Sequence, residues 1–401
     1  MTLVDVHWGK ARCAVLILPL MMAGAMSRAQ ANPDVATQRA VELEQQGNLA
    51  AAEDAWKAVL KTHPKSADAY AHLGFLEAHQ ERYAEAVTLY RKALLLNPAM
   101  PGLRMNLGLA QFKGGQLKDA VASFQLLLKH ERAESPEAQR LTTLIGLAYY
   151  GVGEYADAVP YLKKATSYDK QSLPFRLALA HSCLGAKQYP CVLDVYHEIL
   201  ELNAESAEAD MLAGEAQDEM RDHVEATKQF RAAVKADPKA PGAHFGLGYL
   251  LWTQMQYEEA AENFQAELEL DPNHVQSMAF LADCDIRLNK PDAAQPLLEK
   301  ALQLDASNEL AHLNMGILLA DAGRKEDALH ELKEAARLTP GDVNVHFRLA
   351  RLYKSMGRAE EAKVEFDKTS SLTKAADESV FTKLKDAQSK GQQDGGVSAQ
   401  K

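Results

Sequence analysis

Small apolar residues return at a regular interval along most of this chain. The segment AEAVTLYRKALLLNP, Ala84 to Pro98, has close relatives that end at Pro238 and Pro272, which gives a period of 34 residues. In that register one site is always Gly or Ala, spaced by 34 residues except for 38 between the third and fourth copies: Ala40, Gly74, Gly108, Gly146, Ala180, Gly214, Gly248, Ala282, Gly316 and Ala350. The pattern predicts one unit repeated about ten times.

A second small site and a large apolar site accompany each copy. Twelve residues after the first site the chain has Ala, or Val at position 192. Four residues later it has a large side chain: Trp56, Tyr90, Phe124, Leu162, Tyr196, Phe230, Phe264, Leu298, Leu332 or Phe366. Small residues on two successive helices let the helices approach closely, and the large side chain fills the space beside them. Each repeat is therefore predicted to be a helical hairpin.

Glycine and proline mark the predicted helix ends. Glycines stand between the two helices of five repeats, and prolines follow the second helix of five: Gly47, Gly115, Gly153, Gly323 and Gly357; Pro64, Pro98, Pro238, Pro272 and Pro340. One hairpin cannot bury its apolar side alone, but stacked hairpins bury it against their neighbours. The chain is predicted to be an all-α solenoid of helix-turn-helix repeats.

The repeat resembles that of the tetratricopeptide repeat proteins. The family pattern is large-x-x-Leu-Gly-x-x-Tyr, then Ala, Phe, Ala and Pro, and residues 70–98, YAHLGFLEAHQERYAEAVTLYRKALLLNP, match it. The resemblance implies a right-handed superhelix over residues 32–374, with repeats near 33–66, 67–100, 101–138, 139–172, 173–206, 207–240, 241–274, 275–308, 309–342 and 343–374. It is specific for the fold and says little about function, because the repeated residues are those that pack the solenoid.

Three segments depart from the repeat. The extra residues before Gly146 lie in KHERAESPEAQR and indicate a longer linker or helix end. The 173–206 repeat has Ala180, Cys183 and Val192 at the usual Gly, Tyr and Ala sites, together with Pro174 and Pro190, so looser packing is expected there. Residues 375–390 keep an apolar stripe and are predicted to form a capping helix, followed by a flexible tail, 391–401.

The N-terminus has the plan of a secretory signal peptide. Lys10 and Arg12 precede an uncharged run, and Ala29-Gln30-Ala31 forms a small-x-small cleavage site. Cleavage after Ala31 would remove residues 1–31 and export the mature chain to the periplasm or the medium, without a membrane span. Retention of the segment as an anchor is the alternative.

Charge argues against two classes of partner. The chain carries 44 basic and 55 acidic residues, a net charge of -11. Removing residues 1–31 takes away three basic residues and one acidic residue, so the mature chain has 41 and 54 and a net charge of -13. Such a chain should repel nucleic acid and anionic membranes. A protein or peptide partner is expected.

No sequence motif indicates catalysis, a metal or a cofactor. The signal and the solenoid together leave no room for a catalytic domain. The pattern His-Glu-x-x-Glu begins at His130, His197 and His330, but it lacks the second His that a zinc helix needs. The protein is therefore predicted not to be an enzyme.

Cys183 and Cys191 are candidates for a disulfide. One lies late on a first helix and the other early on the next helix, across a tight turn. Exported thiols that lie close together oxidise when their Cα atoms are within about 7 Å. The spacing alone leaves open whether this geometry is met.

The resemblance also implies a binding groove, since first helices line the concave surface in this family. The residues carried onto those positions are unusually apolar: Phe75, Met105, Asn106, Leu109, Phe112, Leu147, Tyr150, Phe245, Tyr249, Trp252, Phe280, Leu313, Asn314, Ile317, Phe347, Arg348 and Arg351. Exposed apolar groups in a groove are what a peptide or helix partner would cover. The alternative is that some of them only pack between repeats.

One subclass of the family binds a peptide's terminal carboxylate with Lys and Asn of one repeat, Asn of the next, and Lys and Arg of a third. Asn314 and Arg348 match the middle Asn and the last Arg, but Ala279 and Asp283 stand where the first Lys and Asn should be. The set of carboxylate-binding residues is therefore incomplete. Asn314, Arg348 and Arg351 remain candidates for holding one acidic group.

The leading functional prediction is a non-catalytic scaffold of the cell envelope that binds a protein segment in its groove. The alternative is an accessory subunit of polysaccharide export, pilus or outer-membrane assembly machinery, in which the aromatic residues would stack on sugars. The recognition arm of a glycosyltransferase is a third reading, which the missing catalytic domain disfavours.

Overall fold

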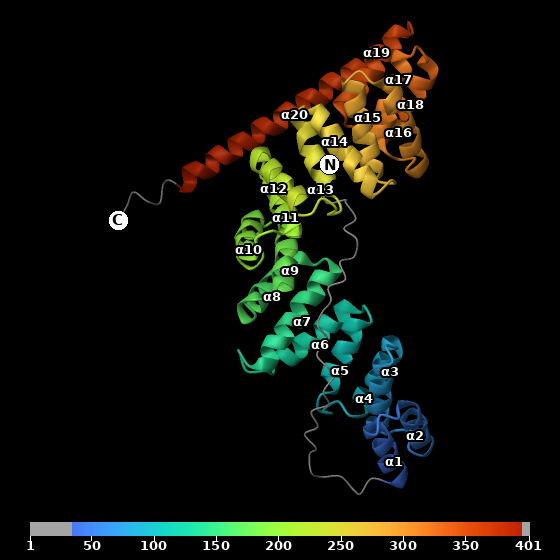
Figure 1. Ribbon diagram of the computed structural model, residues 1–401, viewed down its shortest axis with the longest axis vertical. Coiled ribbons are helices and arrows are strands. Elements are labelled where there is room, and N and C mark those ends of the chain that lie inside the picture. The colour runs from blue at the N-terminus through green and yellow to red at the C-terminus, as the bar shows by residue number, and fades with distance from the viewer. Residues whose placement is uncertain (1–33, 395–401) are drawn as a thin grey trace, which may run out of the picture. The chain divides into compact units, whose positions relative to one another are not determined.

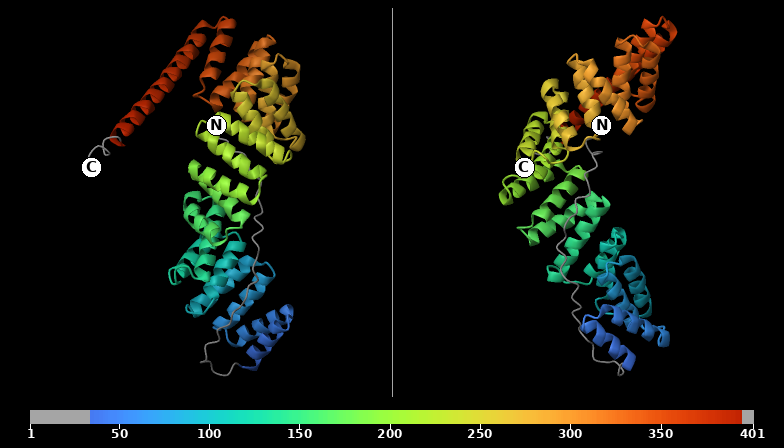
Figure 2. Two further views of the ribbon diagram at one scale, coloured as in Figure 1. Left: turned by 60° about the vertical axis from the view of Figure 1, so that its left-hand side comes forward. Right: turned by 45° about the vertical axis from the view of Figure 1, so that its right-hand side comes forward.

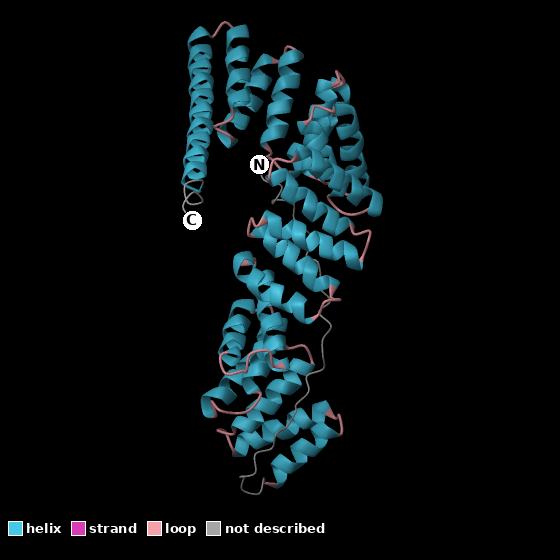
Figure 3. Cartoon of the chain, turned by 90° about the vertical axis from the view of Figure 1, so that its left-hand side faces the viewer, coloured by secondary structure: helices cyan, strands magenta, loops and turns pink. Residues whose placement is uncertain are grey.

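The computed structural model describes residues 34–394, and every regular element in that range is a helix (Figures 1 and 3). The helices are α1 (Val35–Gln45), α2 (Leu49–Thr62), α3 (Ala67–His79), α4 (Tyr83–Leu96), α5 (Leu103–Lys113), α6 (Leu117–Leu128), α7 (Pro136–Val152), α8 (Tyr155–Tyr168), α9 (Leu173–Gly185), α10 (Tyr189–Leu202), α11 (Ala207–Glu219), α12 (His223–Ala236), α13 (Ala243–Thr253), α14 (Tyr257–Leu270), α15 (Val275–Arg287), α16 (Pro291–Leu304), α17 (Glu309–Asp321), α18 (Lys325–Leu338), α19 (Val343–Ser355) and α20 (Ala359–Asp394). Each predicted repeat holds one odd-numbered first helix and one even-numbered second helix. The predicted α-solenoid class is confirmed.

The chain divides into two compact units, which meet between Gln229 and Phe230 within α12. In each unit the hairpins follow one another as stacked layers (Figure 2). Consecutive helices pack on each other from α1 to α11 in the first unit and from α13 to α20 in the second, and first helices of successive repeats also contact each other within a unit, as α7 contacts α9 and α15 contacts α17. The first helices therefore form a layer of their own in each unit. We call the exposed side of this layer the first-helix face.

The repeated small residue makes room for the large residue sixteen positions later. A Cβ atom added to Gly108 would lie 2.5 Å from Cε1 of Phe124, and one on Gly316 would lie 2.6 Å from Cγ of Leu332. At Gly248 the added atom would lie 2.9 Å from Phe264 and 3.2 Å from a backbone oxygen. These distances are below van der Waals contact, so glycine lets the two helices of a hairpin touch. The predicted pairing of small and large sites is thus present in the packed core.

In all ten turns between first and second helices, the residue at one equivalent position has a left-handed backbone conformation. Its φ lies between +58° and +77°: Gly47, Glu81, Gly115, Gly153, Lys187, Arg221, Met255, Asn289, Gly323 and Gly357. The following residue closes the turn, as the Gln256 amide does by donating to the Leu251 carbonyl at 2.9 Å. This is the Schellman pattern of helix ends. The sequence analysis found only the five glycines, because a non-glycine residue gives no signal there.

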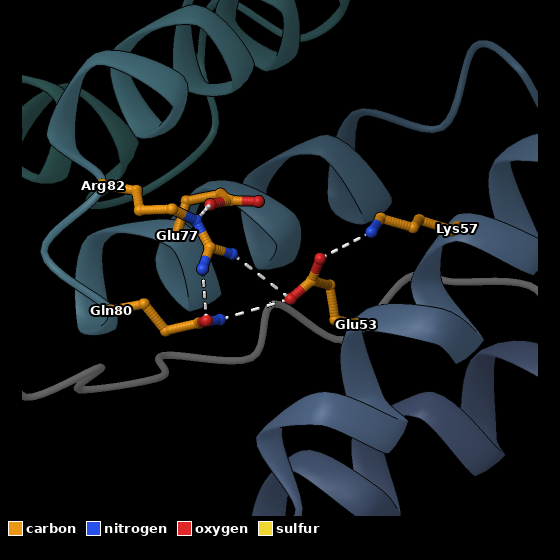
Figure 4. A network of polar contacts seen from close by, with 5 residues as sticks. All are labelled: Glu53, Lys57, Glu77, Gln80 and Arg82. Carbon is orange, nitrogen blue, oxygen red and sulfur yellow. Dashed lines mark hydrogen bonds and ion pairs between the residues drawn. The ribbon is translucent and has the colours of Figure 1, made fainter.

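A polar network joins the first two repeats (Figure 4). Glu53 of α2 accepts hydrogen bonds from Lys57 at 2.5 Å and, in the next repeat, from Gln80 at 3.2 Å and Arg82 at 3.4 Å. Arg82 also contacts Glu77 and Gln80 on its own turn. The bonds from Lys57 and Gln80 lower the pKa of the Glu53 carboxyl. Glu53 is therefore charged near neutral pH, and it joins α2 to the turn that follows α3.

Buried histidines join the helices of two later repeats in the same way. His312 Nδ1 lies 2.7 Å from Glu331 on α18, and its Nε2 lies 3.1 Å from the Ala306 carbonyl. His346 repeats the arrangement with Glu365 at 2.5 Å and the Pro340 carbonyl at 2.9 Å. A carboxylate and a carbonyl accept hydrogen bonds, so both nitrogens of each ring face acceptors. These buried positions therefore hold polar contacts between helices as well as apolar packing.

The three irregular segments differ from expectation in instructive ways. The extra residues before Gly146 lengthen a helix: α7 has 17 residues and begins after Ser135, whose hydroxyl caps the Ala138 amide. Pro174 and Pro190 lie in the first turns of α9 and α10, where a missing N–H is tolerated. The expected loosening is not seen, since Cys183 and Val192 are fully buried.

The predicted capping helix, 375–390, is not a separate element. Helix α20 runs without a break for 36 residues from the last repeat to Asp394, so it also takes in the start of the predicted tail. The reason is local, because the residues around Lys374 include no Gly or Pro to end the helix. Within residues 34–394 no helix combines the length and apolarity that a membrane crossing needs. The predicted signal peptide, 1–31, and residues 395–401 lie outside the described range.

The shared turn conformation predicts opposite effects for two substitutions. Met255 has φ +61° and a side chain that is 74% exposed, so Met255→Gly should raise the free energy of unfolding by about 1 kcal/mol by removing left-handed strain. Gly323→Ala should lower it by a similar amount, since φ is +77° there and nothing lies near the added atom. Gly341→Ala is the control, with open space and no positive φ. Urea unfolding measures all three, and equal midpoints for Met255→Gly and the parent would contradict the strain.

The contact between His312 and Glu331 predicts a pH dependence. The hydrogen bond to Glu331 raises the pKa of His312 above its ordinary value, against the opposing effect of burial. A raised folded-state pKa contributes stability that is complete below the unfolded value of about 6.5 and is lost as pH rises through the folded value. His312→Gln should therefore destabilise most at pH 6 and progressively less at higher pH. Thermal melts of parent and variant across that range measure the difference, and a constant gap would show that the pair is neutral.

Candidate partner-binding surface

The predicted groove residues fall on first helices of both units and differ in depth. Five are buried: Leu147, Phe245, Phe280, Leu313 and Asn314. Ten are partly exposed: Phe75, Met105, Asn106, Leu109, Phe112, Tyr150, Tyr249, Trp252, Ile317 and Arg348. Two are exposed: Phe347 and Arg351. The five buried side chains pack between repeats, as the alternative interpretation held, and the binding role of the others stays a prediction.

Four aromatic residues gather on α13 and α15 in the second unit. The ring centroids of Trp252 and Phe280 lie 5.1 Å apart, and those of Tyr249 and Phe280 lie 5.6 Å apart, both edge to face. Phe245 lies 6.1 Å from Phe280 beneath them. We call Phe245, Tyr249, Trp252 and Phe280 the aromatic cluster. Its two buried rings support two partly exposed ones, which is the arrangement of a pre-formed apolar contact surface.

A buried carboxylate orients the outer edge of this cluster. The Trp252 indole N–H donates to Asp283 Oδ2 at 2.6 Å, and Arg287 Nε donates to the same oxygen at 2.6 Å. The Arg287 guanidinium also lies 5.1 Å from the ring of Tyr257. Asp283 therefore fixes the Trp252 ring and keeps Arg287 beside it. From the sequence, Asp283 was recognised only as a departure from the carboxylate-binding pattern. Arg287, which follows it by one helical turn, was not identified.

The last repeats carry polar groups without partners. Asn314 is 1% exposed; its amide nitrogen reaches the Ala279 carbonyl at 3.5 Å, but its Oδ1 has no partner in the structure. Arg348 Nε is likewise buried and unpaired. Arg351 lies over the ring of Phe347, which is 40% exposed. Buried unpaired polar atoms are costly, so Asn314 and Arg348 lower the stability of this end of the second unit.

In the first unit the predicted residues take part in the core more than in a surface cluster. Phe112 packs against the cores of two neighbouring repeats, and Met105 and Leu109 pack against one of them. Tyr150 is partly exposed, with its ring 6.1 Å from that of His181. The aromatic cluster of the second unit has no counterpart among the predicted residues of the first.

Cys183 and Cys191 are joined by a disulfide in the structure. Their Cα atoms lie 5.8 Å apart, and the bond closes the turn between α9 and α10. Cys284 is a free, buried thiol, and burial raises its pKa to about 12. A thiol of that kind is protonated and unreactive near neutral pH. Across the described residues no three His, Cys, Asp or Glu side chains are placed to hold one metal ion.

Comparison with known proteins gives one family. One tetratricopeptide repeat model matches residues 37–102, 193–241, 211–275 and 281–343, more than half of the chain, and two further tetratricopeptide repeat models match 77–145, 319–376 and 140–172. DnaJ protein P58IPK homolog A of Oryza sativa subsp. japonica is 23% identical over 350 residues, 83% of this chain and 68% of that protein. BBSome complex member BBS4 of Bos taurus is 25% identical over 72% of this chain and 54% of its own length.

Two solved structures are also similar. YrrB, described as a TPR protein with an unusual peptide-binding site, is 21% identical, with a TM-score of 0.37 over 44% of this chain and 91% of that one. A tetratricopeptide repeat protein from Parabacteroides merdae is 19% identical, with a TM-score of 0.46 over 62% and 96%. The repeat register, the stacked hairpins and the family matches agree, and the chain belongs to the tetratricopeptide repeat family.

Proposed function

We propose that this protein is a non-catalytic scaffold of the cell envelope that binds a segment of another protein on its first-helix face. The family is one of scaffolds for protein interactions. The observation that carries the proposal is the aromatic cluster, in which buried Phe245 and Phe280 hold Tyr249 and Trp252 at the surface. Interfaces concentrate their binding energy on such anchored aromatic side chains.

The geometry of the cluster suits a protein segment with an apolar side chain. Trp252 is held by Asp283, so little side-chain freedom is lost when a partner covers the ring. Arg287 stands beside it as a charged rim that can pair with a carboxylate of the partner. An extended or helical segment that offers an apolar residue next to an acidic one would satisfy both.

Two observations support the envelope as the location. Residues 1–31 have the basic, apolar and small-x-small order of a secretory signal. The Cys183–Cys191 disulfide fits an oxidising compartment, because the cytosol keeps thiols reduced.

The partner test removes the two outer rings together. Tyr249→Ala with Trp252→Ala should weaken binding of a partner captured from envelope extract by about 100-fold, since anchored aromatic residues contribute about 2 kcal/mol or more each and are not additive. The matched control is Tyr168→Ala, a partly exposed aromatic residue that ends the second helix α8 of the first unit. Titration with the purified partner measures both, beside thermal melts.

The two variants distinguish the possible results. Binding lost only in the double variant, with helical signal retained, supports the proposal. Unchanged affinity in that variant would remove the aromatic cluster from the function. Unfolding of the double variant would show that Tyr249 and Trp252 are core residues.

Export makes a separate prediction. Mature protein from the envelope fraction should begin at Asn32, and after unfolding it should show one free thiol, Cys284, because the disulfide holds two of the remaining cysteines. N-terminal sequencing and thiol titration without reductant measure these features. A cytosolic protein that begins at Met1 would contradict export.

A further inference from the structure

Helix α11 of the first unit is acidic throughout. Its thirteen residues include no Lys or Arg and five acids: Glu208, Asp210, Glu215, Asp218 and Glu219. In the repeat register, Glu215 and Asp218 stand 34 residues before Tyr249 and Trp252. They therefore hold the positions that carry the exposed aromatic residues of the next repeat.

Glu215 is buried without a partner. It is 8% exposed, and no hydrogen bond or ion pair joins it to any described residue. The carboxylates of Glu219 and Asp218, one helical turn further along α11, repel its charged form. Burial and then repulsion by Glu219 and Asp218 raise the pKa of Glu215 to about 8. A buried carboxyl that has a raised pKa and no partner is suited to form an ion pair with a cation.

The titratable groups on neighbouring elements already have partners. His181 of α9 bonds Glu208 at 2.8 Å. Tyr189, at the start of α10, donates to Glu219 at 3.2 Å. His223, at the start of α12, bonds Asp218 at 2.8 Å. None of these three groups is bonded to Glu215, which leaves its carboxyl free to pair with a cation.

We propose that Glu215, flanked by Asp218 and Glu219, receives a lysine or arginine side chain of a protein segment bound on the first-helix face of the first unit. This rests on the proposed scaffold function and names the chemistry of its partner. A cationic side chain fits better than a metal ion, because the described residues hold no group of three metal donors. The mature chain's charge of -13 favours the approach of a basic segment. When the cation binds, the Glu215 carboxyl releases its proton to solvent and forms the ion pair as carboxylate.

The test uses the full mature chain and two short synthetic peptides, one alternating lysine with leucine and the other glutamate with leucine. The lysine peptide should bind the parent at least about tenfold more tightly, the size expected of a charged hydrogen bond. Its affinity should rise as pH increases from 6 to 8, and calorimetry in buffers of different ionisation enthalpy should detect proton release. Glu215→Gln should abolish the proton release and lower the affinity by about tenfold.

Glu201→Gln is the matched control, since Glu201 is exposed on the second helix of the preceding repeat. It makes the same charge change away from α11 and should leave affinity and proton release unchanged. Glu215→Gln also removes the repulsion, so at pH 8 it should melt at or above the parent's temperature, which separates lost binding from unfolding.

Equal affinity of the parent for the two peptides would overturn the inference. So would a Glu215→Gln variant that binds the lysine peptide with the parent's affinity and proton release, and Glu215 would then be a buried acid only. Either result leaves the scaffold function standing if the Tyr249 and Trp252 variant still loses its captured partner. Selective lysine-peptide binding that depends on Glu215 supports the inference whatever the aromatic variant does.

Discussion

The close contact between a small residue on one helix and a large residue on the next holds every repeat together. Glycine at 108, 248 and 316 brings the helix backbone within contact of Phe124, Phe264 and Leu332, leaving no space for a Cβ atom without movement. The large side chains are almost wholly buried as a result. Dispersion forces fall steeply with distance, so a gap at this point would forfeit contacts along both helices. The stacking of repeats depends on hairpins that are first closed in this way.

This contact explains why the fold could be predicted so fully from the sequence. Helix packing requires a residue of a particular size at a particular position. Because this requirement recurs in ten repeats, it appears in the sequence as a regular period. The turns are different, because they need a backbone conformation and not a side chain. Glycine meets that need at five turns, whereas Glu81 and Met255 meet it at some strain and with no trace in the sequence. The sequence did not predict that α20 is unbroken, for a related reason. The end of a repeat's apolar pattern does not show whether the helix itself ends there.

The candidate surface was predicted only in part. Helical periodicity says which side of a helix a residue lies on, but not how deeply a neighbouring helix covers it. Tyr249 and Phe280 both lie on first helices, yet one reaches the surface and the other is 6% exposed under adjacent rings. Apolar character also misled the selection of residues, because it favoured Leu313 in the core over Asp283 and Arg287, which orient Trp252. Polar side chains that position an aromatic ring become visible only when distances are known.

The same register that constrains the core leaves the first-helix face free to vary. Sites for small and large residues accept few alternatives, because each change of volume is felt by two helices. The positions one and four residues after the first small site carry no such demand. In the 207–240 repeat they hold Glu215 and Asp218, and in the next repeat they hold Tyr249 and Trp252. A solenoid can therefore change from an acidic to an aromatic face within one repeat without altering its packing. The chemical character of the first-helix face is set repeat by repeat, by residues that the fold does not require.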